Sequence, residues 1–204
     1  MLALRFREVR LWMTLLCKYL CGFSIVKGVL SDGTSIAVKQ LSSKSRQGNR
    51  EFITEVGMIS GLQHPNLVKL YGCCIEGKQL LLIYEYLLNN NLARALFSPE
   101  KHSLNLDWPI RMKICVGIAK GLAYLHEESR LKIVHRDIKA TNVLLDENLN
   151  AKISDFGLAK LHEEENTHIS TRIAGTVLVF YKRKGTYLNL LIQILALITQ
   201  KRRS

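Results

Sequence analysis

The chain has 204 residues, 48% of them hydrophobic and 23% charged, which is the composition of a folded globular domain and not of a disordered segment. Its formal net charge is +12, but the basic residues gather toward the two ends, so we expect no nucleic-acid-binding surface on the folded body. Five cysteines without a C-x-x-C pair argue against a zinc site and fit a reducing compartment.

Residues 1–24 form a basic and apolar leader that we leave unassigned. Arg5, Arg7 and Arg10 precede an apolar run that Lys18 interrupts. No small-residue cleavage site is evident, and the chain contains no run of 18 apolar residues, the length that a membrane-spanning helix needs. We therefore expect neither a signal peptide nor a transmembrane helix.

A β-hairpin is expected where the regular pattern begins. Val29-Leu30 and the run from Ser35 to Lys39 are separated by Ser31-Asp32-Gly33-Thr34, and Asp-Gly between apolar runs is a turn signal. Lys39 ends the second predicted strand. It is either a charge at the edge of a strand or a cation that reaches the phosphates of a nucleotide.

The next pattern predicts a helix over residues 50–62, because apolar residues recur at helical spacing. Its apolar side is formed by Phe52, Val56, Ile59 and Leu62. Glu55 lies close to that side. It is either a solvated helix carboxylate or the ion-pair partner of Lys39, and the order of the motifs favours the ion pair.

Two strands and two helices follow. Residues 67–75 and 79–86 have the composition of strands, and with the hairpin they predict a sheet accompanied by one helix. Asn89 to Asn91 predict the cap of a short helix at 92–97, and a longer helix is expected over 108–126. The buried face of the longer helix is predicted to contain Met112, Cys115, Val116, Ala119, Leu122, Ala123 and His126.

A dense polar loop then lies between two short apolar runs, residues 133–134 and 143–145. It contains an acid, Asp137, a base, Lys139, and an amide, Asn142, within six residues. Phosphoryl transfer needs such a set of groups. A carboxylate orients the hydroxyl and accepts its proton, a cation neutralises the transferred group, and an amide oxygen helps to hold a metal ion.

This loop has the pattern H-R-D-x-K-x-x-N, and Asp155-Phe156-Gly157 follows eighteen residues after Asp137. The alternative is a polar surface loop and an unrelated turn, but both motifs in this order and spacing are a strong signal. Over about residues 25–176 the chain resembles a eukaryotic protein kinase. It looks most like the kinase domain of plant leucine-rich-repeat receptor-like serine/threonine kinases, truncated at both ends. The closer match rests on residues 27–34, 36–42, 64–72 and 135–142.

The resemblance implies an α/β (α+β) fold of the two-lobe kinase type, in an incomplete form. Residues 25–86 would be a partial N-lobe, with a sheet and one helix, and residues 87–176 the first part of a helical C-lobe. The implied function is transfer of the ATP γ-phosphoryl group to protein serine or threonine hydroxyls in receptor-like signalling. The implied cofactors are ATP and Mg²⁺, and the implied partners are a protein substrate and a receptor or co-receptor kinase. The implied location is cytoplasmic, and full-length relatives would sit in the plasma membrane with this domain on the cytoplasmic side.

The functional residues of the family carry over one position at a time. The resemblance implies catalytic roles for Asp137, Lys139 and Lys39. It implies ATP contacts for Ile25, Ala37, Lys39, Glu55, Glu85, Leu87 and Leu144. The implied magnesium ligands are Asn142 and Asp155.

Two departures from the family pattern bear on activity. Only Gly22 stands where the family has its G-x-G-x-x-G loop, and a single glycine cannot supply several close backbone approaches to phosphates. Gly175-Thr176 is not followed by an A-P-E segment. These departures predict little phosphotransfer by this chain alone. They support an alternative function, a catalytically impaired fragment that binds a nucleotide or a partner protein.

Residues 177–204 depart from the family altogether. An apolar run over 188–198 lies between two basic clusters, 182–184 and 201–203. The run is either an interfacial helix on anionic lipid or translated non-coding sequence, and the abrupt loss of resemblance favours the second interpretation. A third function, that of a membrane-associated basic protein, would depend on this tail.

Overall fold

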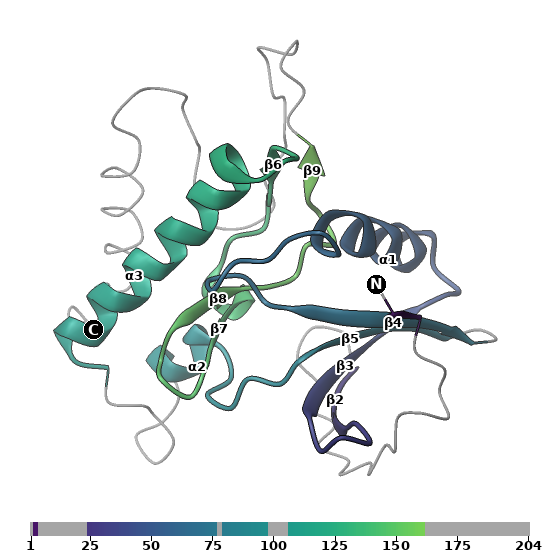
Figure 1. Cartoon of the computed structure of the whole chain (residues 1–204), viewed down its shortest axis with the longest axis horizontal. Coiled ribbons are helices and arrows are strands. Elements are labelled where there is room, and N and C mark those ends of the chain that lie inside the picture. Colours follow the sequence, from purple (N-terminus) through teal and green to yellow (C-terminus); the bar gives the residue numbers. More distant parts are fainter. Residues whose placement is uncertain (1, 4–23, 77–78, 98–105, 162–204) are drawn as a thin grey trace. The chain divides into compact units, whose positions relative to one another are not determined.

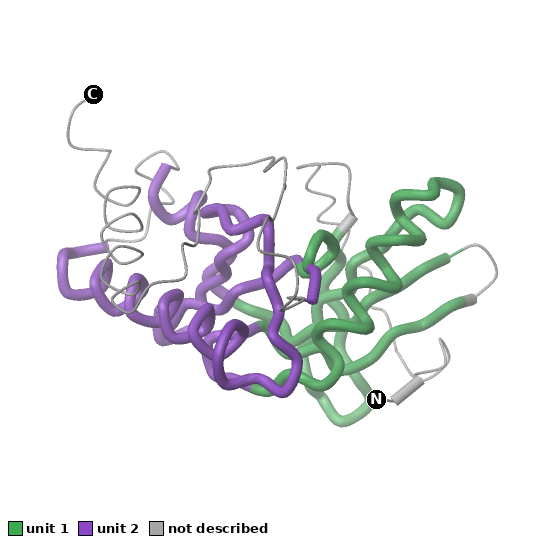
Figure 2. The backbone as a smooth tube through the Cα atoms, turned by 90° about the horizontal axis from the view of Figure 1, so that it is seen from above, with its two compact units in different colours: residues 1–63, 68–87, 156–159 green, residues 64–67, 88–155, 160–204 purple. Residues whose placement is uncertain are grey.

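The computed structural model describes residues 2–3, 24–76, 79–97 and 106–161 (Figure 1). The chain divides into two compact units (Figure 2). Unit 1 comprises residues 1–63, 68–87 and 156–159, and unit 2 comprises residues 64–67, 88–155 and 160–204. The expectations for Gly22, for the segment after Gly175-Thr176 and for the apolar tail lie outside the described residues.

Unit 1 contains a five-stranded sheet with the strand order β1-β4-β5-β3-β2. The strands are β1 (Leu2–Ala3), β2 (Ser24–Val29), β3 (Ser35–Ser42), β4 (Leu70–Glu76) and β5 (Gln79–Glu85). All neighbours are antiparallel except β1, which runs parallel to β4. The predicted hairpin and the predicted strand pair are confirmed, whereas no pattern indicated β1. The prediction that Lys39 ends its strand is wrong, because β3 continues to Ser42.

The turn between β2 and β3 is closed by its own polar groups. The Gly33 amide donates to the Leu30 carbonyl (3.0 Å), the Leu30 amide donates to the Thr34 carbonyl (2.9 Å), and Asp32 Oδ1 accepts a bond from the Thr34 amide (2.9 Å). Gly33 has φ +88°, a conformation that residues with a Cβ rarely adopt. The Asp-Gly pair therefore fixes the turn as the sequence predicts.

The two faces of the sheet differ because side chains alternate along a strand. Ile36 and Val38 of β3 pack with Leu81 and Ile83 of β5 in one apolar cluster. Lys39 lies on the opposite face of β3. Helix α1 (Arg46–Ile59) packs against β3 and β5.

Helix α1 begins four residues before its predicted start and ends three residues before its predicted end. Ser45 is the N-cap, and its hydroxyl accepts a hydrogen bond from the Gly48 amide (2.9 Å). The apolar pattern could not indicate this first turn, because its residues are polar and exposed apart from Gly48. The cap therefore decides where the helix begins.

Unit 2 begins with α2 (Leu92–Phe97), whose predicted bounds are confirmed. Asn91 caps it by accepting a bond from the Arg94 amide (2.9 Å). The longer helix, α3 (Trp108–Ala123), is capped by Asp107 and ends in a π-helical turn, η3 (Tyr124–Glu128). The predicted single helix thus changes its hydrogen-bonding pattern before His126. Among the described residues, no helix is long and apolar enough to cross a membrane.

The predicted buried face of α3 is wrong at Val116, which is 37% exposed. The residues that are buried are Ile114, Cys115, Gly117, Ile118, Gly121 and Leu122. A Cβ atom at Gly117 would lie 2.8 Å from Asn66 Nδ2, so the absent side chain allows Asn66 to approach the helix. The helix face that packs closely therefore includes glycines, which add nothing to a hydrophobic pattern.

Two short antiparallel pairs complete the described part of unit 2. The apolar runs flanking the polar loop form strands, as expected: β6 (Ile133–Val134) pairs with β9 (Lys160–Leu161), and β7 (Val143–Leu145) pairs with β8 (Ala151–Ile153). A 3₁₀ turn, η4 (Ala140–Asn142), leads directly into β7. Strand β8 packs against α3. Each end of the polar loop is therefore anchored in a strand pair.

Candidate active site

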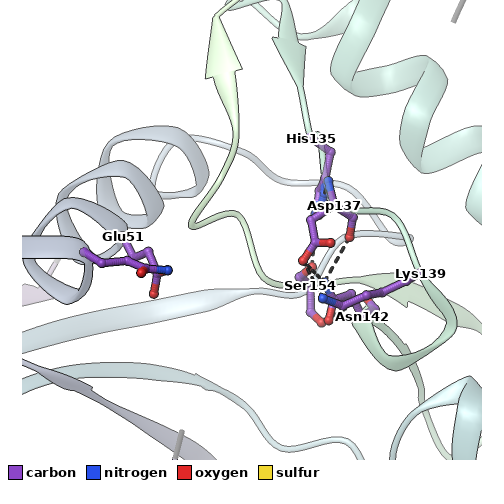
Figure 3. A network of polar contacts seen from close by, with 7 residues as sticks. Glu51, His135, Asp137, Lys139, Asn142 and Ser154 are labelled. Atoms are coloured by element: carbon purple, nitrogen blue, oxygen red, sulfur yellow. Dashed lines mark hydrogen bonds and ion pairs between the residues drawn. The ribbon is translucent and has the colours of Figure 1, made fainter. Parts of the chain in front are cut away.

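Asp137 is a buried carboxylate held by two neighbours in the polar loop (Figure 3). Its Oδ2 atom accepts a bond from Lys139 Nζ at 2.7 Å and from Asn142 Nδ2 at 2.9 Å. Asn142 Nδ2 also donates to the Asp137 carbonyl at 3.0 Å. Because both of these side-chain bonds go to Oδ2, they leave Oδ1 as the carboxylate oxygen that could accept a proton.

His135 also contacts this loop (Figure 3). Its Nδ1 atom accepts a bond from the Asp137 amide (3.3 Å), and its Nε2 atom faces the Ser154 carbonyl (3.0 Å). These partners match the neutral imidazole, with the proton on Nε2. Burial lowers the pKa of His135 to about 4, and the bond to Ser154 opposes this shift only in part. The ring is therefore neutral at physiological pH.

The backbone of Asn142 is tied to the residue before Asp155. The Ser154 amide (2.9 Å) and the Ser154 hydroxyl (3.0 Å) both donate to the Asn142 carbonyl. Asp155 itself has φ +67°, and Arg136, which precedes Asp137, has φ +70°. Residues other than glycine adopt this conformation at a cost, and such strain gathers at functional sites. Both of these residues belong to the two motifs that the sequence singled out.

These residues fit a magnesium ion. Asn142 uses its amide nitrogen in both bonds to Asp137, so its amide oxygen is the group that could coordinate a cation. Together with the Asp155 carboxylate it offers oxygen ligands, which Mg²⁺ prefers. In the part of the chain that the structure describes, no group of three or more His, Cys, Asp or Glu residues forms a metal cage. Mg²⁺ commonly uses one or two protein oxygens together with substrate phosphates.

In unit 1, the structure brings Lys39 and Glu55 together. Lys39 Nζ lies 3.0 Å from Glu55 Oε2, and the two residues are 7% and 0% exposed. Glu55 Oε1 also accepts a bond from the Phe156 amide (3.3 Å). The interpretation of Glu55 as a solvated helix carboxylate is therefore wrong. The carboxylate holds the lysine and the backbone of the D-F-G motif at the same time.

The other predicted ATP contacts of unit 1 lie on the sheet or just after it. Ile25 pairs directly with Lys39 across β2 and β3, and Ala37 is two residues before Lys39, so these three side chains share one face. Glu85 closes β5: its amide donates to the Lys69 carbonyl (3.0 Å), and its Oε1 accepts a bond from the Lys69 amide (2.8 Å). Leu87 follows two residues later and is half-buried.

The predicted residues thus fall into two sets. In unit 1 these are Ile25, Ala37, Lys39, Glu55, Glu85 and Leu87. In unit 2 they are Asp137, Lys139, Asn142, Leu144 and Asp155. Leu144 lies in β7 and forms a bridge with Asn91.

Sequence reasoning missed Ser154, which immediately precedes Asp155 and donates two hydrogen bonds to the Asn142 carbonyl. Its only signal is its position immediately before Asp155. No sequence pattern predicts the bond that this hydroxyl makes, because that bond depends on how β8 and the polar loop fold against each other.

Comparison with known proteins agrees with this geometry. The family model described as "Protein tyrosine and serine/threonine kinase" matches residues 23–180. The chain belongs to this kinase family. Three similar relatives come from Arabidopsis thaliana. A probable LRR receptor-like serine/threonine-protein kinase is 82% identical over 153 residues, and a probable leucine-rich repeat receptor-like serine/threonine-protein kinase is 77% identical over 156 residues. A further probable LRR receptor-like serine/threonine-protein kinase is 59% identical over 153 residues.

The matches cover 75% or 76% of this kinase chain but only 15% of each relative, so the chain spans about a seventh of the relatives' length. The predicted resemblance and the predicted kinase fold are confirmed, including the partial two-lobe character. Kinases of this family in general use ATP and a divalent metal ion and act on proteins.

Proposed function

We propose that residues 24–161 supply the catalytic core of a protein serine/threonine kinase that transfers the γ-phosphoryl group of ATP to a protein hydroxyl. The observation that supports this most strongly is the buried Asp137 carboxylate, held at Oδ2 by Lys139 and Asn142 with Oδ1 left to face a substrate. Lys139 in the H-R-D-x-K pattern resembles the serine/threonine type of catalytic loop.

In this proposal Asp137 orients the substrate hydroxyl and accepts its proton, and Lys139 neutralises charge on the transferred group. Lys39, kept in place by Glu55, contacts the α- and β-phosphates. Asn142 and Asp155 hold Mg²⁺, which supplies charge neutralisation at the phosphates when it is bound. Proximity and electrostatics then provide most of the rate enhancement.

The remaining assignments of the proposal concern the adenine base, the two lobes, and the location and partners of the domain. Ile25, Ala37 and Leu144 pack against the adenine, and the backbone of Glu85 and Leu87 meets its polar edge. Residues 25–86 act as the N-lobe and residues 87–176 as the first part of the C-lobe. The domain works in the cytoplasm on a protein substrate, with a receptor or co-receptor kinase as its partner.

The test uses the full purified chain and measures MgATP binding by titration calorimetry and phosphotransfer with labelled ATP. Lys39→Met should weaken MgATP binding, while Lys44→Met, a change at an exposed lysine outside the site, should not. Asp137→Asn should retain binding and lower phosphotransfer by about 100-fold or more, because it removes the general base. Equal phosphotransfer by the wild type and Asp137→Asn would contradict the proposal.

A second candidate function is MgATP binding without turnover. It is favoured by the single Gly22 where kinases of this family have a glycine-rich loop. In that case the wild type would bind MgATP, Lys39→Met would lose the binding, and neither protein would transfer phosphate at a rate above the Asp137→Asn background.

A further inference from the structure

A groove on unit 2 lies beside the residue that the apolar pattern wrongly assigned to the core. Val116 lines a cavity of about 540 Å³ together with Pro65, Met112 and Gly117, and we call these four lining residues the floor. All four residues belong to unit 2. Val116 is exposed, and it lines a concave part of the surface. The groove therefore has an apolar floor onto which a side chain can pack.

The lining of the groove also contains three lysines, which we call its rim. Lys113 and Lys120 from α3 and Lys152 from β8 line the cavity. Lys113 Nζ donates to the carbonyl of Asn148 (2.8 Å), a neutral acceptor that leaves the charge of the lysine in place. The groove therefore combines an apolar floor with a positive rim.

Among the described residues, Asp146 is the one acidic residue that lines the groove, and its carboxylate is hydrogen-bonded within its own loop. Its Oδ1 accepts bonds from the amides of Asn148 (2.9 Å) and Asn150 (2.8 Å). Its Oδ2 accepts a bond from Asn150 Nδ2 (2.8 Å). These neutral donors leave the charge of Asp146 in place, but three lysines against this one carboxylate give the described lining residues a net charge of +2, so the groove attracts acidic groups.

The floor is fixed by bonds that do not involve the lysines. Asn66 Nδ2 donates to the Ala151 carbonyl (2.8 Å), and the Ile153 amide donates to the Asn66 carbonyl (2.9 Å). The absent side chain of Gly117 lets α3 close onto Asn66. A partner would therefore meet a preformed groove, and little ordering of the protein would oppose binding.

The spacing along α3 suggests the form of the partner. Lys113, Val116 and Lys120 are at positions i, i+3 and i+7, which lie along one face of a helix. The two lysines are about 10 Å apart along the axis at 1.5 Å per residue. In an extended peptide, side chains four residues apart lie on one face about 13 Å apart, and the side chain midway between them points the same way. The flexible lysine side chains bridge the difference between these two spacings.

We propose that this groove docks an acidic protein segment of the form acid-x-apolar-x-acid. The carboxylates would pair with Lys113 and Lys120, and the apolar side chain would pack on Val116. The apolar floor favours a peptide over a uniform polyanion, because a phosphate chain offers no side chain to fill it. The proposal does not depend on phosphotransfer, and its tests use neither ATP nor Mg²⁺.

The probe is a fluorescein-labelled peptide, Glu-Ser-Leu-Ser-Glu, titrated with the full chain at low ionic strength and followed by fluorescence anisotropy. Lys120→Glu should weaken binding by about tenfold, and Val116→Asp should weaken it similarly. The control is Lys44→Glu, which makes the same change in net charge at an exposed lysine of unit 1 and should alter binding by less than about twofold. Lys120→Gln provides a milder variant in case charge reversal impairs folding.

The peptide variants separate the contributions of charge and apolar packing. Gln-Ser-Leu-Ser-Gln and Glu-Ser-Ser-Ser-Glu should both bind more weakly than the probe. The proposal is overturned if the wild type does not bind the probe, or if Lys44→Glu weakens binding as much as Lys120→Glu, since the basic chain would then attract acids without a site. It is also overturned if only a phosphoserine peptide binds, or if anionic lipid vesicles bind at Lys120 and the probe does not compete with them.

Discussion

Lys39 Nζ lies 3.0 Å from Glu55 Oε2, although the lysine belongs to β3 and the glutamate to α1. The pair is nearly excluded from water. Two buried charges at this distance compensate each other, but either charge alone would be costly to bury. The ion pair therefore fixes α1 against the sheet through one contact, and it keeps the lysine in a single orientation.

The first prediction concerns this ion pair. Glu55→Gln should lower the free energy of unfolding by about 3 kcal/mol, because it replaces the charged partner of a nearly buried lysine with a neutral amide. The double variant Lys39→Met/Glu55→Leu should be more stable than Glu55→Gln, since neither charge remains. Urea unfolding of the wild type, Lys39→Met, Glu55→Leu and the double variant measures the coupling between the two sites. Additive single effects would show that the pair has no such role.

The second prediction concerns the two residues that organise the loop of unit 2. Asn142→Ala removes two bonds to Asp137 and one candidate metal ligand, so the Mg²⁺ concentration that half-saturates ATP binding should rise about tenfold or more. Ser154→Ala removes only a hydroxyl bond and leaves the backbone bond to Asn142 intact, and it should raise that concentration by less than about threefold. Equal effects of the two variants would argue against Asn142 as a ligand.

The third prediction compares two glycines in helices. Gly117→Ala should destabilise the protein by about 1–3 kcal/mol, because its Cβ would lie 2.8 Å from Asn66 Nδ2, which is itself bonded to Ala151. Gly57→Ala should stabilise the protein by about 0.5–1 kcal/mol, because it lies within α1 with nothing within 4 Å of the added Cβ. Thermal unfolding of both variants tests the opposite signs.

The same glycines explain which features of the fold the sequence could predict. The Asp-Gly turn and the Asn91 cap depend on neighbouring residues, so local patterns predicted the hairpin and the bounds of α2. The buried face of α3 depends on Asn66, which comes from a turn far away in the sequence, and on Gly117, which has no hydrophobic signal. The hydrophobic pattern therefore predicted that Val116 is buried, whereas the buried face includes the neighbouring Gly117 instead.

The site residues divide in a similar way. The spacing of Asp137, Lys139 and Asn142 could be interpreted directly, because all three lie in one loop and the chemistry of phosphoryl transfer needs all three. The pairing of Lys39 with Glu55 could be predicted only from the order of the motifs, since sixteen residues separate them. The bonds of Ser154 could not be predicted, because they depend on how β8 returns to the loop.

The last prediction follows from His135. Its neutral ring accepts a bond from the Asp137 amide at Nδ1 and donates from Nε2 to the Ser154 carbonyl. Protonation of Nδ1 would place a charged ring in a buried position, and this burial lowers the pKa of His135 to about 4. In the unfolded chain a histidine titrates near 6.5. Between these two values the unfolded state binds the proton more readily than the folded state.

Stability should therefore be complete above about pH 6.5 and fall as the pH drops toward 4, with a slope of at most about 1.4 kcal/mol per pH unit from this residue. Urea unfolding between pH 5 and 7 measures the slope, since carboxylates of ordinary pKa remain largely ionised there. His135→Phe keeps a ring at this position without a titratable group, so its stability should vary less with pH than that of the wild type. An unchanged slope in His135→Phe would mean that another group controls the acid sensitivity.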